Sequence, residues 1–278
     1  MIRISNLSFG YKKGNNIFED FSLDIEKGKV IGLLGKNGTG KSTLLYLLTG
    51  LLHAQKGEIR FNGTDVKRRE PNILQETFIV TEEFELPNIT LKRYVDATAP
   101  FYPRFSHEQL KNYLEVFEMP MDVKLGELSM GQKKKAYISF ALATNTNFLV
   151  MDEPSNGLDI PSKSQFRKAI TMGMNDERTV IISTHQVRDI DTLLDHVIII
   201  DDKKVLMDAS TAKIGSTLFF GEEEGNSTEE GIIYTQPSVT GSSILRANRG
   251  DEESNLNLEL LFNATLAQRN EIAKLFKK

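Results

Sequence analysis

The chain has 278 residues and a formal net charge of -4 at neutral pH, with 40% hydrophobic and 26% charged residues. This composition is typical of a soluble globular protein, and its slight acidity argues against a nucleic-acid-binding surface. The absence of cysteine excludes disulfides, thiol catalysis and cysteine-based zinc sites. No apolar run approaches the ~20 residues that cross a bilayer, and Met1–Ser5 has no signal-peptide core, so we expect any membrane role to come through a partner.

The first 34 residues of the chain lead into a glycine-rich turn. Ile2–Phe9 and Phe21–Ile25 alternate apolar and polar residues on either side of a turn at 12–16, which predicts an antiparallel ribbon. Val30–Leu34 is a continuous apolar run of the buried parallel type. It is followed by Gly35–Ser42, which fits the pattern G-x-x-x-x-G-K-[ST], and by a predicted helix over Lys41–Leu48.

This turn has the chemistry of a nucleotide phosphate cradle. Glycines at 35, 38 and 40 let backbone N–H groups point inward, where they and the helix N-terminus surround phosphate oxygens. Lys41 can then reach the β- and γ-phosphates, and the Ser42 hydroxyl can bind Mg²⁺. Tyr11, just after the first strand, either covers a purine base bound to the cradle or is a half-exposed tyrosine at a strand end.

Helices dominate the middle of the chain. A short strand within residues 55–63 and another at Phe78–Val80 precede a helical pattern from Thr90 to about Leu128, with Thr90 and Ser106 as helix-entry residues. A further helix is predicted from Gly131 to about Thr144. We interpret the basic triplet at 133–135 as a solvated face of that helix.

Two later strands end in ionisable side chains. Phe148–Met151 ends in Asp152 and Glu153, and Val180–Thr184 ends at His185. Ligand sites of open α/β sheets lie at the carboxyl edge of the strands, so these residues are candidates for one site. A hairpin turning at residues 202–203 completes a domain that we assign to residues 1–210, with its helical part at about 83–145.

Residues 211–278 differ in composition and carry no chemical motif. The acidic segment 221–231 predicts an exposed loop. Ile232–Thr235 and Ser243–Leu245 predict short strands, and Leu258–Lys278 predicts one amphipathic helix. We expect a small appendage.

With the cradle, Leu128–Gln132 and Asp152–Asp159 in view, the chain resembles the ATP-binding cassette family over roughly residues 1–208. Ser129–Gln132 looks like the signature motif, Phe148–Asp152 like Walker B, Ser155–Asp159 like the D-loop, and His185 like the switch histidine. The resemblance implies an α/β P-loop NTPase fold with a mixed sheet, an N-terminal antiparallel ribbon, a helical insertion and, after it, the small α+β appendage.

The resemblance also implies an ATPase that uses Mg²⁺. Ser42 and Asp152 would hold the metal, Glu153 would polarise the attacking water and His185 would orient it, while Tyr11 would stack on adenine. ATP would be bound by Gly35, Asn37, Gly38, Thr39, Gly40, Lys41, Ser42, Thr43, Ser129, Gly131, Gln132 and Asp159, and the resemblance implies that Ser129 and Gly131 come from a second copy.

Two residues depart from the family pattern. Met130 replaces the first glycine of the signature, and Glu82 stands at the position of the Q-loop glutamine, a ligand of Mg²⁺ or water. Glu82 either swings between the metal and a resting position or is a surface charge whose role has passed to a neighbour such as Glu83.

The partners implied are a second cassette, in a head-to-tail homodimer or a heterodimer, and an integral-membrane permease that keeps the chain on the cytoplasmic face of the cell membrane. The segment Phe101–Phe105 resembles stand-alone bacterial cassettes of exporters. The alternative is a soluble cassette ATPase that drives an assembly process without a permease. The transported substrate and the direction of transport depend on another chain.

Overall fold

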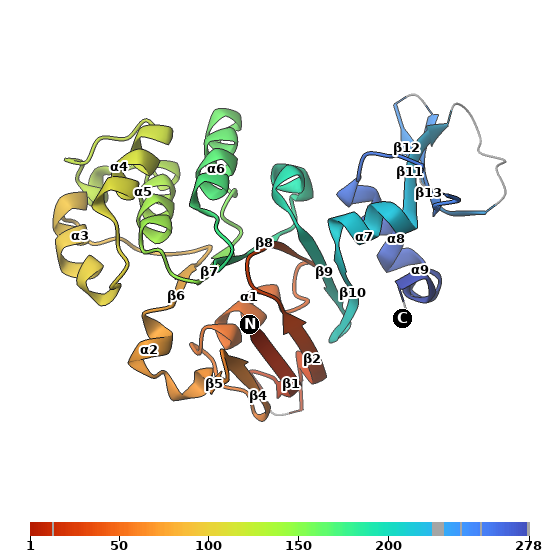
Figure 1. Ribbon diagram of the computed structural model, residues 1–278, viewed down its shortest axis with the longest axis horizontal. Helices are drawn as coiled ribbons and strands as arrows, with labels where there is room; N and C mark the ends of the chain where they lie inside the picture. Colours follow the sequence, from red (N-terminus) through yellow and green to blue (C-terminus); the bar gives the residue numbers. More distant parts are fainter. Residues whose placement is uncertain (13, 224–230, 240, 251, 277–278) are drawn as a thin grey trace.

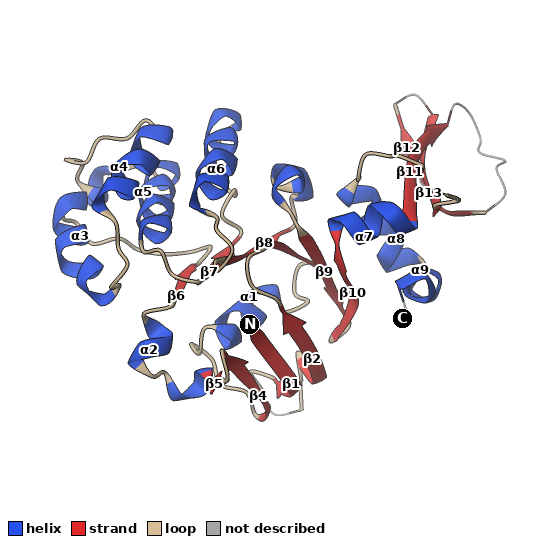
Figure 2. Cartoon of the chain, viewed as in Figure 1, coloured by secondary structure: helices blue, strands red, loops and turns tan. Residues whose placement is uncertain are grey.

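A computed structural model describes residues 1–12, 14–223, 231–239, 241–250 and 252–276 (Figures 1 and 2). Its centre is a six-stranded sheet in the order β10-β9-β3-β8-β7-β6. All neighbours are parallel except β10, which pairs antiparallel with β9. The strands are β3 (Val30–Leu34), β6 (Thr77–Val80), β7 (Phe148–Asp152), β8 (Thr179–Thr184), β9 (His196–Asp201) and β10 (Lys204–Ser210).

The parallel strands end along one edge of this sheet. The segments that follow β3, β6, β7 and β8 therefore meet there, as the prediction from the strand ends required. The β9–β10 hairpin turns at Asp202 and Lys203, as predicted. Both have positive φ, 48° and 65°, which is the geometry of a type I′ turn.

A second, antiparallel sheet in the order β2-β1-β4-β5 confirms the predicted N-terminal ribbon and adds the strand after the P-loop helix to it. Ile4 pairs with Leu23 on β2 and with Ile59 on β4. The four leucines of α1 are buried in one cluster with side chains of both sheets, so this helix lies between them. These elements are β1 (Ile2–Phe9), β2 (Phe18–Ile25), α1 (Lys41–Leu48), β4 (Lys56–Phe61) and β5 (Thr64–Asp65).

The helical insertion follows β6, as predicted. Thr90 and Ser106 cap its helices, since their hydroxyls accept hydrogen bonds from the backbone N–H of Arg93 and Gln109, each at 3.2 Å. Its helices are α3 (Leu91–Thr98), α4 (His107–Val116) and α5 (Met130–Ala143), while the short helix α2 (Pro71–Leu74) precedes β6. Short 3₁₀ turns are η1 (Val66–Arg68), η2 (Ala99–Phe101), η3 (Leu125–Glu127), η4 (Val187–Asp189) and η5 (Asp191–Leu193).

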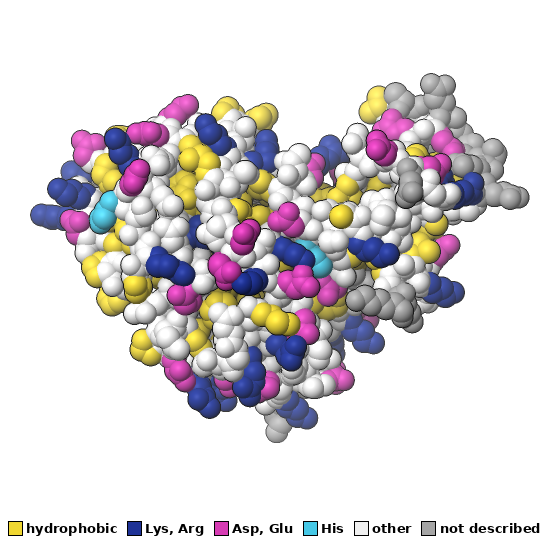
Figure 3. Space-filling view, in the orientation of Figure 1, with side chains coloured by type: hydrophobic (Ala, Val, Ile, Leu, Met, Phe, Trp, Pro, Cys, Tyr) yellow, Lys and Arg dark blue, Asp and Glu magenta, His cyan; other side chains and the backbone are white. Residues whose placement is uncertain are grey.

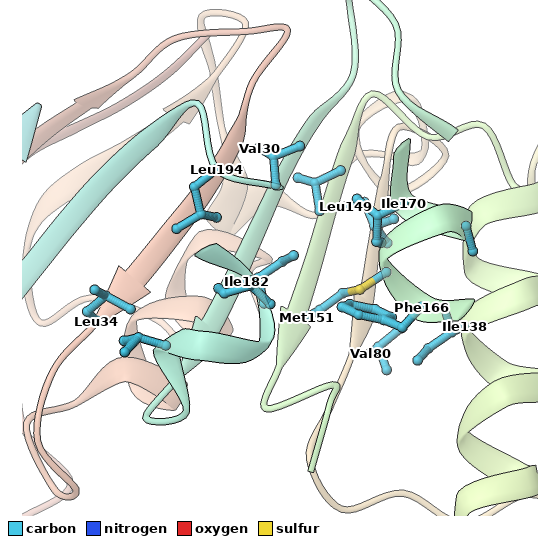
Figure 4. Close-up of a cluster of buried hydrophobic side chains, with 14 of the residues drawn as sticks. Val30, Leu34, Val80, Ile138, Leu149, Met151, Phe166, Ile170, Ile182 and Leu194 are labelled. Atoms are coloured by element: carbon cyan, nitrogen blue, oxygen red, sulfur yellow. The ribbon is translucent and has the colours of Figure 1, made fainter. Parts of the chain in front are cut away.

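The opposite face of the six-stranded sheet carries the larger core. Helices α5 and α6 (Ile160–Gly173) cover this face. The sequence pattern does not predict α6, because only three of its apolar side chains are buried: Phe166, Ala169 and Ile170. In Figure 4, Val80 of β6 and Leu149 and Met151 of β7 lie beside Phe166 and Ile170 of α6 and Ile138 of α5, whereas Val30 and Leu34 of β3 lie on the side of Leu194. Burial of this surface fixes the strands whose ends build the site.

A buried arginine joins the ends of the two covering helices to the sheet. Arg178, directly before β8, is fully buried, and its guanidinium donates to the carbonyls of Thr146 (2.9 Å), Gly173 (2.9 Å) and Leu142 (3.0 Å). Leu142 and Gly173 lie in the last turns of α5 and α6, where the helix dipole is negative. Burial lowers the pKa of Arg178 to about 10, so it remains charged at neutral pH.

We expect Arg178→Met to lower the free energy of unfolding by about 3 kcal/mol or more, because three buried carbonyls lose their donor at ~1–3 kcal/mol each. Urea denaturation followed by circular dichroism measures this. Arg3→Met is the control, since Arg3 forms an exposed ion pair with Asp24 that contributes less than ~1 kcal/mol. Equal losses for the two variants would contradict the structural role of Arg178.

In its described residues, the appendage consists of a three-stranded antiparallel sheet in the order β11-β13-β12 and three helices. The predicted exposed loop 221–231 is wrong for residues 221–223, which continue strand β11 and pair with β13; residues 224–230 lie outside the described residues. The predicted strands at 232 and 243 are confirmed and extend further. The elements are α7 (Thr211–Thr217), β11 (Leu218–Glu223), β12 (Ile232–Ser238), β13 (Gly241–Ala247), α8 (Leu258–Ala267) and α9 (Arg269–Phe276).

The predicted single helix over 258–278 is wrong because it breaks at Gln268, whose backbone is not helical (φ -119°, ψ 45°). The break lets α9 pack against β10, with the Arg269 guanidinium bound to Asp201. Leu218, Leu245 and Leu261 of the appendage are buried in the same cluster as the side chains of β9 and β10. The appendage therefore packs firmly on the six-stranded sheet, and the boundary at residue 210 stays a prediction.

Candidate active site

The glycine-rich turn connects β3 to α1 and has the backbone that phosphate binding requires. Gly40 has φ +100°, and a Cβ there would meet Ile17 at 2.5 Å and Phe18 at 2.9 Å. Gly38, at the exposed tip beside Asn37, has φ +83°. A Cβ at Gly35 would meet the Thr39 hydroxyl at 2.6 Å. These positions keep the turn tight at the N-terminus of α1.

Lys41 begins helix α1 and is 7% exposed. Its ammonium donates to the carbonyls of Gly35 (2.8 Å) and Lys36 (3.3 Å), so it lies inside the turn. Burial lowers the pKa of Lys41, while the carboxylates of Glu153, Asp152 and Glu82 act to raise it. The positive charge is therefore held where the turn and the acidic strand ends meet.

Tyr11 lies beside the same helix. Its hydroxyl is 3.2 Å from the hydroxyl of Thr43, the residue after Ser42, and its ring packs edge-on against Phe9 at 5.2 Å. The side chain is held near the cradle and yet Tyr11 is 62% exposed, which leaves a ring face available to a planar ligand.

The end of β7 places two carboxylates against β8. Asp152 is 1% exposed and accepts a hydrogen bond from the Ser183 hydroxyl. Glu153 follows with a left-handed backbone (φ +45°), a strained conformation that costs on the order of 1–3 kcal/mol and occurs often in active sites. Its N–H donates to the Ser183 carbonyl at 3.1 Å, which fixes the turn.

Glu153 and His185 form a pair, while the roles predicted for them in hydrolysis stay predictions. The imidazole Nδ1 is 2.9 Å from Glu153 Oε1, and the His185 backbone N–H donates to Oε2 at 3.4 Å. The Glu153 side chain is 8% exposed and that of His185 is 40% exposed. A buried carboxylate therefore contacts an imidazole that solvent or a ligand can reach.

Glu82 follows β6 and is exposed, but it is not isolated. Its Oε1 accepts a hydrogen bond from Asn156 Nδ2 at 3.1 Å. Asn156 Oδ1 in turn accepts from Gln186 Nε2 at 3.2 Å, next to His185. The motif analysis gave no role to Asn156, which connects the segments after β6, β7 and β8.

Lys134 is a second residue whose position the sequence analysis missed. The interpretation of 133–135 as a solvated face is wrong for Lys134, which is 3% exposed. Its ammonium donates to the carbonyls of Asn156 (2.8 Å) and Glu153 (3.2 Å). The only sequence signal is a lysine triplet on a helix that is otherwise mostly buried.

The signature residues lie at the N-terminus of α5. Ser129 and Gln132 form a capping box: the Ser129 hydroxyl accepts from the Gln132 N–H at 3.3 Å, and the Gln132 side chain accepts from the Ser129 N–H at 3.0 Å. A Cβ at Gly131 would approach the Gly157 carbonyl at 3.3 Å, so this end of α5 packs on the D-loop. Among the described residues, no hydrogen bond joins these side chains to the P-loop of the same chain.

Asp159 caps helix α6. Its carboxylate accepts from the Ser162 N–H at 2.9 Å, and hydrogen bonds from Ser162 lower the pKa of Asp159. The capping oxygen leaves the second carboxylate oxygen for a further contact, so the predicted ATP contact of Asp159 stays a prediction.

The donors present fit Mg²⁺ bound together with phosphate oxygens. Ser42 lies in the first turn of α1 and Asp152 at the end of β7, and magnesium is commonly held by one or two carboxylates and substrate phosphates. No cluster of three or more His, Asp or Glu side chains suited to a metal occurs within the part of the chain that the structure describes. The candidate ligands of Mg²⁺ therefore come one from each element, Ser42 from α1 and Asp152 from β7.

The molecular surface has no nucleic-acid-like patch on the face seen in Figure 3, where Lys and Arg side chains alternate with Asp and Glu. Within residues 1–12, 14–223, 231–239, 241–250 and 252–276, no helix combines the length and apolarity of a membrane span.

Comparison with known proteins agrees with this geometry. The ABC transporter family profile matches residues 18–156. The ATP-binding protein NatA of Bacillus subtilis (strain 168) is 31% identical over 202 residues, covering 70% of this chain and 82% of NatA. The peptide export ATP-binding protein SkfE of the same organism is 28% identical, covering 75% of this chain and 88% of SkfE. The structure of a dimeric bacterial ABC transporter cassette superposes with a TM-score of 0.66 at 23% identity, covering 76% of this chain and 98% of that one. The chain therefore belongs to the ABC transporter family, as an ATP-binding subunit with ATPase activity.

Proposed function

We propose that this chain is the ATP-hydrolysing motor of a membrane exporter, working as a head-to-tail dimer on a separate permease. The observation that carries the hydrolytic part is the meeting of Lys41, Asp152 and the Glu153–His185 pair at one sheet edge. A buried lysine at a helix N-terminus binds phosphate, and a buried carboxylate next to a histidine positions water.

Each residue then has a chemical task. Lys41 and the N–H groups of the turn bind the β- and γ-phosphates, and Tyr11 stacks on the base. Glu153 accepts a proton from the attacking water, and His185 keeps the Glu153 carboxylate oriented. Mg²⁺ held by Ser42 and Asp152 would neutralise charge on the phosphates.

The dimer proposal is supported by the signature. The N-terminus of α5 has its dipole and Ser129 exposed at the surface, away from hydrogen-bonding contact with its own P-loop. A second chain in head-to-tail orientation would bring this end to the γ-phosphate, where it stabilises charge in the transition state. A heterodimer with a similar cassette would use the same surfaces.

The permease would bind in an apolar groove between β6 and the helical insertion. The groove has a volume of about 440 Å³, and three of its lining residues are exposed hydrophobics: Phe101 (68%), Leu51 (49%) and Leu74 (36%). Its one ionisable guanidinium, from Arg69, is bound to the Gly50 carbonyl. An apolar helix on the cytoplasmic side of a membrane protein has the matching chemistry.

The segment Phe101–Phe105 supports the exporter assignment and shapes this groove. Tyr102 packs against Phe78 and Phe140, which holds Phe101 outward. Curated relatives of similar identity are named for peptide export and for zinc uptake, so their names favour neither direction of transport.

We expect Phe101→Glu to reduce recovery of the membrane partner about tenfold or more, since a charge replaces an apolar anchor at the centre of the contact. The measurement is quantitative mass spectrometry of native complexes purified from detergent-solubilised membranes. Met172→Glu is the control, because Met172 is 47% exposed and lies outside the groove.

Wild type and Met172→Glu should retain the same polytopic protein, and Phe101→Glu should lose it while ATPase activity of the isolated chain persists. In everted vesicles, the wild-type complex should accumulate a solute in the lumen when ATP is added. Recovery of a soluble assembly with no polytopic protein would instead support an ATPase that drives assembly.

A further inference from the structure

The hydrogen bonds of Lys134 do not by themselves explain how the charge of its buried ammonium is compensated. Lys134 is only 3% exposed. Burying an ammonium group costs folding free energy unless the group is hydrogen-bonded and paired with a negative charge. The hydrogen bonds go to two carbonyls, those of Glu153 and Asn156, which hold the turn after β7. Neither acceptor carries a formal charge.

Asn156 connects Lys134 to a negatively charged side chain, that of Glu82. Asn156 accepts from Lys134 through its carbonyl at 2.8 Å and donates from its side-chain amide to Glu82 at 3.1 Å. One asparagine thus connects the acid after β6 to the lysine on α5. The same asparagine also binds Gln186, beside His185.

The charges around the ammonium support this pairing. Burial lowers the pKa of Lys134, and Glu82 opposes that effect more strongly than Glu153 or Asp152. Glu82 also opposes the lowering of the Lys41 pKa by burial, together with Glu153 and Asp152. The carboxylate of Glu82 is therefore within electrostatic reach of both the phosphate cradle and Lys134.

We propose that Lys134 is a positioning residue for ATP hydrolysis, which holds the Glu153–Asn156 turn and supplies the positive charge that compensates Glu82 beside the triphosphate. Without Lys134, the Glu82 carboxylate would repel the nucleotide, and the turn that carries Glu153 would lose its donor. Asn156 is the link between the two charges.

A double-mutant cycle of Glu82→Gln and Lys134→Gln tests the proposal. Only the turnover measurement rests on the proposed role of Glu153 in hydrolysis. Affinity for metal-free ATP is measured by calorimetry in EDTA, and kcat and KM by phosphate release with Mg²⁺. Lys133→Gln is the control, since it removes the same charge one residue earlier on the same helix, where the ammonium makes no hydrogen bond to the turn among the described residues.

We expect Lys134→Gln to weaken metal-free ATP binding about three- to tenfold, as the uncompensated Glu82 repels the phosphates. Glu82→Gln alone should strengthen it by a similar factor, and the double variant should return near wild type. The kcat of Lys134→Gln should fall about 10- to 100-fold through misplacement of Glu153, with recovery of part of this loss in the double variant.

A Lys134→Gln chain that binds metal-free ATP as tightly as wild type, or a double variant that binds it as weakly as Lys134→Gln, would overturn the proposal and leave Lys134 a purely structural residue. If Lys134→Gln does not fold, the melting temperature of Glu82→Gln tests the charge pairing. Glu82→Gln should lower the melting temperature, because it removes the counter-charge of the buried ammonium. Glu83→Gln should leave the melting temperature unchanged. Because metal-free binding does not involve water activation, the coupling is measurable even if Glu153 has another role.

Discussion

Glu153→Gln is expected to keep ATP binding and to reduce turnover about 10²- to 10⁴-fold. The amide preserves the size of the side chain and its contact with His185, at 2.9 Å in the wild type, but it cannot accept a proton from water. Because the Glu153 side chain is only 8% exposed, bulk solvent offers no equivalent base at that position.

The measurement is single-turnover hydrolysis, with ATP affinity determined in parallel. Glu85→Gln, at an exposed glutamate in the loop after β6, is the matched control and should hydrolyse ATP at the wild-type rate. The slow variant should also accumulate as an ATP-bound closed dimer by size-exclusion chromatography. Hydrolysis by Glu153→Gln at the wild-type rate would show that another group activates the water.

Mixing two inactive variants is expected to restore activity if each site is shared between chains. Lys41→Ala removes the phosphate-binding ammonium, and Ser129→Arg blocks the signature at the N-terminus of α5. A head-to-tail dimer of one chain of each kind contains one intact site, built from the P-loop of the Ser129→Arg chain and the signature of the Lys41→Ala chain. The mixture should therefore hydrolyse ATP at least about tenfold faster than either variant alone.

Circular dichroism controls for folding, because loss of the Ser129 cap costs about 1 kcal/mol of helix stability. Wild-type specific activity should also rise with protein concentration as dimers form. Two folded variants that remain inactive after mixing, together with a concentration-independent wild-type rate, would be incompatible with the shared site.

The residues that meet at the sheet edge could be predicted because their signals are local. Lys41 follows a glycine pattern, and Asp152, Glu153 and His185 each end a short apolar run, so chain order and strand polarity were enough to bring them together. The same logic predicted the caps at Thr90 and Ser106, which the structure confirms.

The residues that were missed depend on contacts distant in sequence. Lys134 belongs to a helix that is buried on several sides, where a lysine triplet gives no indication of which ammonium points inward. Asn156 connects three segments only after β6, β7 and β8 are aligned. Similarly, β11 ends in acidic residues that resemble a loop until they pair with β13, and the helix break at Gln268 accompanies an ion pair between Arg269 and Asp201 that the sequence does not indicate.

The single apolar core that joins the appendage to β9 and β10 has a thermodynamic consequence. Leu218, Leu258 and Leu261 share their burial with Met207 of the catalytic sheet, so neither part can expose its side of this contact without losing hydrophobic free energy. Heating should melt both as one cooperative unit, and a nucleotide that stabilises the distant P-loop should raise the melting temperature of β11–β13 by the same amount. The melting temperature of the appendage therefore reports whether nucleotide occupies the catalytic site.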